Sequence, residues 1–143
     1  MPSSVGDTRE TVPQEPIDVV RSIYAGWERG DFSSIEWADP EIEVAFADGP
    51  EPGRWKGLDA MSRHYAEWLR GWKDSAAAPE RFIAVDAERV LVLVHNTARG
   101  RSSGVKLDAR SVANLFEVRN GKVTSLTLYM NRGRALADLG LSE

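Results

Sequence analysis

The dipeptide Asn120-Gly121 lies between two strand-like runs and is the feature that most restricts how this chain can fold. Asn-Gly readily supplies the two positive φ angles of a type I′ turn, so Val105–Arg119 and Lys122–Asn131 are predicted to pair as an antiparallel hairpin. The turn fixes the register of the two strands, and the register fixes the face to which each side chain points. A short helix ending at residues 139–141 is predicted to follow.

Two further helices are predicted in the first half of the chain. One begins at Pro16 and is ended by Gly30, with apolar residues at helical spacing: Ile17, Val20, Tyr24 and Trp27. The other runs from Leu58 to about Trp72 and carries a broad apolar stripe: Leu58, Met61, Tyr65, Trp68, Leu69 and Trp72. Residues 1–15 are polar and are predicted to be a disordered segment before a single domain of residues 16–143.

The remaining elements are predicted to be strands. In Glu41–Phe46 charged and apolar residues alternate, so that Ile42, Val44 and Phe46 share one face, which Asp48 extends if the strand continues. A Pro/Gly-rich loop is predicted for residues 48–57, and further strands for residues 81–87 and 89–99. Helices followed by a strand meander predict an α+β fold in which the helices lie across one face of a curved antiparallel sheet.

Composition narrows the possible partners and compartments. The chain has no cysteine, which excludes disulfides and thiol catalysis, and two histidines on different elements do not predict a metal site. The net charge is −4 and no long basic run is present, so no nucleic-acid partner is predicted. No apolar stretch approaches the roughly 20 residues of a membrane span, and the N-terminus lacks the pattern of a signal peptide. We therefore predict a soluble, cytoplasmic protein with no membrane partner.

The strand Val90–Val94 is apolar at every position, so both of its faces are predicted to be covered. The helices would cover one face. A second copy of the same sheet, in a homodimer, is the favoured cover for the other face. The alternative is that an N-terminal or C-terminal segment of the same chain covers it.

Three segments of the chain resemble a known family: IYAGWERGD, GRWKGLDAMSRHYAEW and NGKVTSLTLYMNRGRALADLGL. They are similar to the SnoaL-like branch of the NTF2-like superfamily, which includes ketosteroid isomerase and polyketide cyclases, and the resemblance extends over about Ile17–Leu141. It implies an NTF2-like (cystatin-like) cone, in which N-terminal helices and a curved sheet enclose a deep pocket. It also implies a cofactor-independent isomerase or cyclase that acts on an apolar, polyketide-like intermediate. The alternative is a non-catalytic protein that binds a hydrophobic small molecule.

Two aspartates of SnoaL-type cyclases have no counterpart in this sequence. Counted from Asn120-Gly121, the acid/base aspartate of the family corresponds to Leu128, and the second aspartate corresponds to Asn131. Neither residue can ionise, so the resemblance does not imply the aldol mechanism of that group.

The ketosteroid isomerases within this resemblance suggest other catalytic candidates. Their oxyanion-hole aspartic acid corresponds to Asn114, whose amide can still donate a hydrogen bond. Their general base corresponds to Asp48 or to Ala45, depending on where a gap is placed. Their oxyanion tyrosine corresponds to Ile23, next to Tyr24.

Each catalytic candidate also has a structural interpretation. Asp48 lies in a loop where aspartate commonly caps a turn, and Asn114 could make a structural hydrogen bond. His64, a further catalytic candidate at the edge of the second helix's stripe, could be a partly exposed structural residue.

The resemblance also orients the sheet. It directs a mostly apolar set toward the pocket: Val90, Val92, Val94, Asn96, Asn114, Phe116, Leu126, Leu128 and Met130. The helices and the loop are expected to add substrate-binding aromatic residues: Trp27, Trp55, Tyr65 and Trp68, with Tyr24. His95 is expected on the other face, and Asp108 and Arg110 could pair on one face of their strand. Such a lining is typical of a pocket for a bulky apolar ligand.

Overall fold

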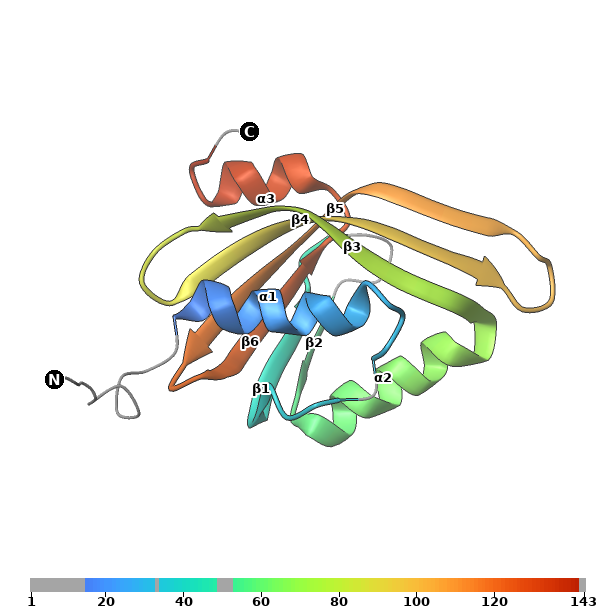
Figure 1. The fold of residues 1–143 in the computed structure, drawn as a ribbon, viewed down its shortest axis with the longest axis horizontal. Helices are drawn as coiled ribbons and strands as arrows, with labels where there is room; N and C mark the ends of the chain where they lie inside the picture. Colours follow the sequence, from blue (N-terminus) through green and yellow to red (C-terminus); the bar gives the residue numbers. More distant parts are fainter. Residues whose placement is uncertain (1–14, 33, 49–52, 142–143) are drawn as a thin grey trace, which may run out of the picture.

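The computed structural model describes residues 15–32, 34–48 and 53–141, which form three helices and six strands (Figure 1). The helices are α1 (Pro16–Trp27), α2 (Leu58–Gly71) and α3 (Arg132–Asp138). The strands are β1 (Ala38–Phe46), β2 (Gly53–Lys56), β3 (Trp72–Ala84), β4 (Arg89–Gly100), β5 (Lys106–Arg119) and β6 (Lys122–Tyr129). None of these helices is long and apolar enough to cross a membrane. The predicted disordered segment lies outside the described residues, apart from Glu15.

The six strands form one curved sheet in the order β2-β1-β6-β5-β4-β3. The predicted hairpin is confirmed, because Asn120 and Gly121 have φ angles of 53° and 76° and join β5 to β6. The α+β class is also confirmed, but the sheet is mixed and not wholly antiparallel, since β1 pairs with β6 in parallel. These two strands are far apart in the sequence. No turn between them fixes their relative direction, so this pairing could not be predicted from the sequence.

Two stretches predicted as helix end or loop are strands in the structure. β3 begins at Trp72, immediately after α2, whereas the sequence predicted a strand only from Arg81. Its first half pairs with β4 from Trp72↔Gly100 onward, and this long-range pairing extends a segment whose alanines have little strand preference of their own. Likewise β2 falls within the predicted loop and is held by pairing with β1.

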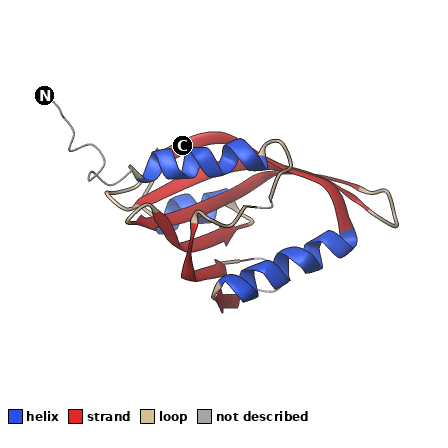
Figure 2. Ribbon diagram, turned by 60° about the horizontal axis from the view of Figure 1, so that its bottom comes forward, coloured by secondary structure: helices blue, strands red, loops and turns tan. Residues whose placement is uncertain are grey.

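The concave face of the sheet carries the larger part of the core. α1 packs across β3, β4 and β5 on this face, and α2 lies against β1 and β2 (Figures 1 and 2). Tyr24 of α1 and Phe116 of β5 are completely or almost completely buried, and their rings meet edge to face at 5.8 Å. The two helices thus pack on different strands of the sheet. This leaves room for a cavity between α2 and the end of α1.

The opposite face of the sheet is covered by α3. Leu91 and Leu93 of β4 form a second apolar cluster with Ala135 and Leu136 of that helix. A C-terminal segment of the same chain thus covers the second face of Val90–Val94, as the alternative interpretation held. The apolar character of this strand no longer requires a second copy, and the homodimer stays a prediction.

The sheet bends where the pairing of its long strands is irregular. Register shifts occur at Glu80 of β3 and at His95 of β4. Arg132 of α3 donates hydrogen bonds to Glu80 Oε1 at 2.9 Å and to the carbonyl of Val94 at 3.2 Å, which lowers the pKa of the Glu80 carboxyl. His95 contacts Asp108 across β4 and β5 and lowers the pKa of that carboxyl. The contacts of Arg132 attach α3 to the bend, and the contact between His95 and Asp108 joins β4 to β5 there.

Candidate functional site

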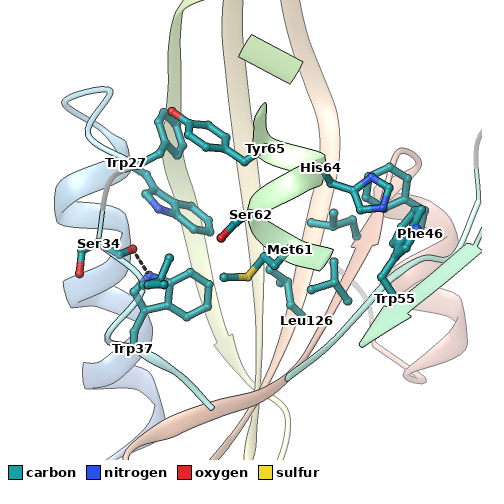
Figure 3. Close-up of a pocket in the computed structure, with 14 residues that line it drawn as sticks. Trp27, Ser34, Trp37, Phe46, Trp55, Met61, Ser62, His64, Tyr65 and Leu126 are labelled. Carbon is teal, nitrogen blue, oxygen red and sulfur yellow. Dashed lines mark hydrogen bonds between the residues drawn. The ribbon is translucent and has the colours of Figure 1, made fainter. Parts of the chain in front are cut away.

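A cavity of about 430 Å³ lies between α2, the end of α1 and the strands β1, β2 and β6 (Figure 3). It is lined mostly by aromatic and aliphatic side chains: Trp27, Phe32, Ser34, Ile35, Trp37, Val44, Phe46, Trp55, Met61, Ser62, His64, Tyr65, Leu126 and Leu128. This volume is within the usual range of small-molecule pockets.

The local structure explains why these side chains meet. The alternation of a strand brings Val44 and Phe46 to the same face of β1, and their partners on β6 are Leu126 and Leu128. The four side chains form an apolar floor. Helical spacing places Met61 and Tyr65 on the face of α2 that looks onto this floor.

Aromatic rings form two walls on either side of the floor. On one side, Trp27 stacks on Phe32 and meets Trp37 edge to face, with ring centroids 5.7 Å apart in both pairs. The Trp37 indole donates a hydrogen bond to the carbonyl of Ser34 at 2.9 Å, which fixes its orientation. On the other side, Trp55 packs against Phe46 at 5.1 Å (Figure 3). A flat apolar ligand can lie between such walls with ring contacts on both ends.

The polar groups of the cavity are few: His64 lies at one end, Tyr65 at the other, and two serines also line it. His64 packs on Trp55 with ring centroids 3.9 Å apart, and its Nδ1 lies 3.5 Å from Glu67 Oε1. Tyr65 lies on the Trp27 side, where burial and the Asp31 carboxylate raise the pKa of its hydroxyl. The hydroxyl of Ser62 lies between these groups. Among the lining residues that the structure describes, none is an aspartate or a glutamate.

Six of the predicted site residues line this cavity: Trp27, Trp55, His64, Tyr65, Leu126 and Leu128. Residues 32–37 have no periodic pattern, so no signal marked four of the lining residues: Phe32, Ser34, Ile35 and Trp37. Strand alternation grouped Val44 with Phe46, and helical spacing placed Met61 in a stripe, but neither signal pointed to a cavity.

Asp48, predicted as a candidate general base, does not lie in the cavity. Its carboxylate accepts hydrogen bonds from the backbone amides of Met130 at 2.7 Å and Asn131 at 3.2 Å, and it does not line the cavity. It therefore ties the end of β1 to the segment that leads into α3. Met130, predicted to face the pocket, is 56% exposed, because β6 ends at Tyr129.

Tyr24 and Asn114 form a buried polar pair in the core. Asn114 Nδ2 donates to the Tyr24 hydroxyl at 2.7 Å, while Asn114 Oδ1 has no partner among the described residues. Burial raises the pKa of Tyr24. Trp27 packs against the Tyr24 ring at 5.0 Å, and neither member of the pair lines the cavity. Their predicted catalytic role stays a prediction.

We expect Tyr24→Phe to lower the free energy of unfolding by about 1–3 kcal/mol, because it leaves the buried Asn114 amide without its partner. The double variant Tyr24→Phe/Asn114→Leu should recover most of this loss, since both polar groups are then absent. Urea denaturation measures the values. Tyr129→Phe is the matched control, because the Tyr129 hydroxyl bonds to Asp138, a carboxylate that water can reach. Equal losses for Tyr24→Phe and Tyr129→Phe would contradict this account.

The other predicted pocket residues lie elsewhere. Trp68 is on the outer side of α2, where it stacks on Trp72 and donates to Ser75 Oγ at 2.8 Å. Asn96 lies on β4 opposite Ala77 of β3 and Ala109 of β5, away from the strands that border the cavity. Phe116 faces the concave side as predicted, but α1 covers it completely. No group of three or more His, Asp or Glu side chains that could hold a metal occurs within residues 15–32, 34–48 and 53–141.

Comparisons with known proteins agree on the fold. The sequence profile of the SnoaL-like domain matches residues 20–126. An NTF2-like protein of unknown function from Burkholderia pseudomallei K96243 has a similar structure, with a TM-score of 0.70, 17% identity, and 87% of this chain and 96% of that chain covered. A candidate SnoaL-like polyketide cyclase from Jannaschia sp. CCS1 has a TM-score of 0.70 at 14% identity, with 96% and 100% covered.

TerC, crystallised with polyporic acid, is also similar, with a TM-score of 0.69, 18% identity, and 87% of this chain and 98% of that chain covered. No protein with a curated function matches this sequence. At these identities the structural similarity establishes the fold, and the profile match establishes the family.

Proposed function

We propose that this chain, which belongs to the SnoaL-like domain family, binds a flat, apolar, polyketide-like intermediate and isomerises or cyclises it without a cofactor. The observation that carries this proposal is the cavity itself, with aromatic walls and one imidazole in its lining. Similar structures that include a candidate polyketide cyclase and TerC with polyporic acid support the class of ligand.

The cavity supports binding mainly through apolar contact. The walls around Trp27 and Trp55 offer ring faces and edges to a planar ligand, and Met61 and Leu126 lie between them (Figure 3). The hydroxyls of Ser62 and Tyr65 can each make a hydrogen bond to a ligand oxygen. A few polar contacts in an apolar lining fix orientation without a large desolvation cost.

The chemistry available is proton transfer at carbon. His64 Nε2 can accept a proton from a carbon next to a carbonyl, while its Nδ1 is turned toward Glu67. The electrons of the C–H bond then form an enolate, whose oxygen can accept a hydrogen bond from the Ser62 hydroxyl, which lies between the two ends of the cavity. Return of the proton to another carbon completes an isomerisation. Alternatively, attack of the enolate carbon on a second carbonyl of the same molecule gives an alkoxide, which takes the proton back from the imidazolium and completes a cyclisation.

A second candidate function is binding without catalysis. It is favoured by the fact that no described lining residue is a carboxylate, and that Leu128 occupies the position of the family's acid/base aspartate. Such a protein would carry or sense the same kind of ligand. Binding alone cannot distinguish the two functions, whereas turnover by wild-type protein does.

Replacing Leu128 by aspartate tests the binding site. A carboxylate on the apolar floor should weaken the binding of 1,4-dihydroxyanthraquinone by about 10- to 100-fold at pH 8, because the ligand would desolvate the charge. Quenching of the fluorescence of Trp27, Trp37 and Trp55, which line the cavity, reports binding. The apolar surroundings should raise the pKa of the introduced carboxyl, so affinity should recover as the pH is lowered and the group becomes neutral.

Thr127→Asp is the matched control, because Thr127 precedes Leu128 on β6 and points to the opposite face of the sheet. It adds the same charge and should leave the affinity within about threefold. Equal weakening by both variants, with circular dichroism showing that both are folded, would remove the cavity as the binding site.

A further inference from the structure

One end of the molecule is built from two segments that are far apart in the sequence. The tip of the β4–β5 hairpin, residues 99–106, lies beside the junction of α2 and β3, residues 68–75 (Figures 1 and 2). The Arg101 amide donates to the carbonyl of Gly71 at 2.9 Å, and its side chain donates to the carbonyl of Leu69. We call these two segments the distal patch.

The distal patch is positively charged although the chain is acidic. Five exposed cations lie in it, Arg70, Lys73, Arg99, Arg101 and Lys106, together with the single carboxylate of Asp74. The patch thus has a net charge of +4, while the whole chain has −4. None of these five cations forms an ion pair with a residue that the structure describes. A region with this charge attracts an anionic partner.

Apolar side chains are exposed beside these cations. Trp68 is 37% exposed and stacks on Trp72, with ring centroids 5.2 Å apart and an interplanar angle of 16°. Val105, at the tip of the hairpin, is 57% exposed. Tryptophan is enriched where proteins meet the headgroup level of a bilayer, because its ring is apolar and its N–H is polar.

We propose that the distal patch docks on the surface of a bilayer that contains anionic phospholipid. This replaces the prediction of no membrane partner, which rested on the lack of an apolar stretch long enough to span a membrane. Lysine and arginine side chains near such a surface each stabilise binding electrostatically, and several act together. Trp68 and Val105 would enter the headgroup region, while the cations contact lipid phosphates. None of the described helices can cross a membrane, so the attachment is peripheral.

The observations favour a bilayer over single-stranded nucleic acid, which also combines phosphate with apolar rings. Proteins that bind single strands use a charged groove with open aromatic faces for base stacking. Here Trp68 and Trp72 cover one face of each other's ring, and the patch is the projecting end of a hairpin and a helix (Figure 2). An exposed Val105 beside them suits acyl chains better than nucleotides.

This proposal goes beyond the proposed function and depends on different residues. None of the five cations, nor Trp68, Trp72 or Val105, lines the cavity. The two are nevertheless compatible, because an apolar ligand partitions into bilayers and α2 carries both His64 of the cavity and Trp68 of the patch. Variants of the distal patch that lose vesicle binding should therefore still bind the ligand. Variants of the cavity that lose ligand binding should still bind vesicles.

Flotation of the full chain with vesicles tests the proposal. We expect binding to vesicles of phosphatidylcholine mixed with phosphatidylglycerol, weakened by added salt, and little binding to phosphatidylcholine alone. The variant Arg70→Gln/Lys73→Gln/Lys106→Gln should lower the partition coefficient by about 100-fold, from a roughly fivefold loss for each cation.

The matched control is Arg54→Gln/Lys56→Gln/Arg119→Gln, which changes the net charge equally at exposed cations outside the patch and should bind as wild type. Quenching of wild-type tryptophan fluorescence by brominated phosphatidylglycerol is a second measurement that needs no variant. The proposal is overturned if wild type binds neither vesicle, if both triple variants lose binding equally, or if wild type binds a thymidine oligonucleotide but no vesicle.

Discussion

Replacing His64 by glutamine should lower the catalysed rate of proton exchange by about 10²- to 10⁴-fold, the usual contribution of a general base. Glutamine keeps the size and polarity of the side chain but cannot take up a proton near neutral pH. Affinity for 1,4-dihydroxyanthraquinone should change by less than about threefold, because the aromatic walls that hold a flat ligand remain. The imidazole would then act on the rate and not on binding.

The measurement is hydrogen–deuterium exchange at the α-carbons of 2-tetralone, a bicyclic ketone, followed by NMR in D2O. His95→Gln is the control, because the chain's only other histidine lies at the sheet bend and contacts Asp108 outside the cavity. Equal losses in the two variants would refute the role of His64. If wild-type protein binds the anthraquinone and gives no exchange above buffer, the non-catalytic binding function is the better account.

Glu67 should act as a positioning residue for this imidazole. Its Oε1 lies 3.5 Å from His64 Nδ1, on the next turn of α2, and it does not line the cavity. We expect Glu67→Gln to lower the catalysed rate of exchange about tenfold without changing the affinity for the anthraquinone, because the imidazole loses the partner that orients it. A residue with a merely structural role would leave the exchange rate of the folded variant unmoved.

Phe116→Ala should lower the free energy of unfolding by about 3–5 kcal/mol, a loss typical of a large side chain removed from a sealed core. Phe116 has no exposed surface, and its ring lies between Tyr24 at 5.8 Å and Trp27 at 6.2 Å. The surrounding strand and helix cannot close fully over the lost ring, so both burial and packing are lost. Urea denaturation at constant slope gives the change.

Phe46→Ala is the matched control for this prediction. It makes the same chemical change on the same sheet, but Phe46 is 37% exposed and lines the cavity. Its loss should be about 1–2 kcal/mol, because less apolar surface leaves water on folding. It should also weaken binding of the anthraquinone, which Phe116→Ala would affect only through the fold. A loss from Phe116→Ala no larger than that from Phe46→Ala would contradict the placement of the core.

The sequence predicted the parts of the site that follow from local geometry. The Asn120-Gly121 turn set the β5–β6 register and so placed Leu126 and Leu128 on one face. Helical spacing put Tyr65 in the stripe of the second helix and His64 at its edge. It also grouped Trp68 with the lining residues, although that side chain lies outside the cavity. Periodicity shows on which side of a helix or strand a side chain lies, but not what packs against that side.

Longer-range features were decided by packing. Strand alternation assigns Asn96 to a face of β4, but the cavity lies over β1, β2 and β6, in the other half of the sheet. Asp48 satisfies two backbone amides at the end of β6, a bond between residues more than eighty positions apart. These hydrogen-bond partners are set by the packing of the whole sheet, so they could not be predicted from the position of Asp48 in the sequence.

By itself the sequence determined the hairpin, the helices and the α+β class, because turn dihedrals and side-chain periodicity act over a few residues. Only the tertiary structure decided that β1 runs parallel to β6, that α3 covers the second face of the sheet, and that the candidate proton acceptor in the cavity is His64. It also gathered the cations of the distal patch from separate segments. The physical reason is that pairing and packing between distant segments depend on the free energy of the whole fold. A short stretch of sequence does not determine that free energy.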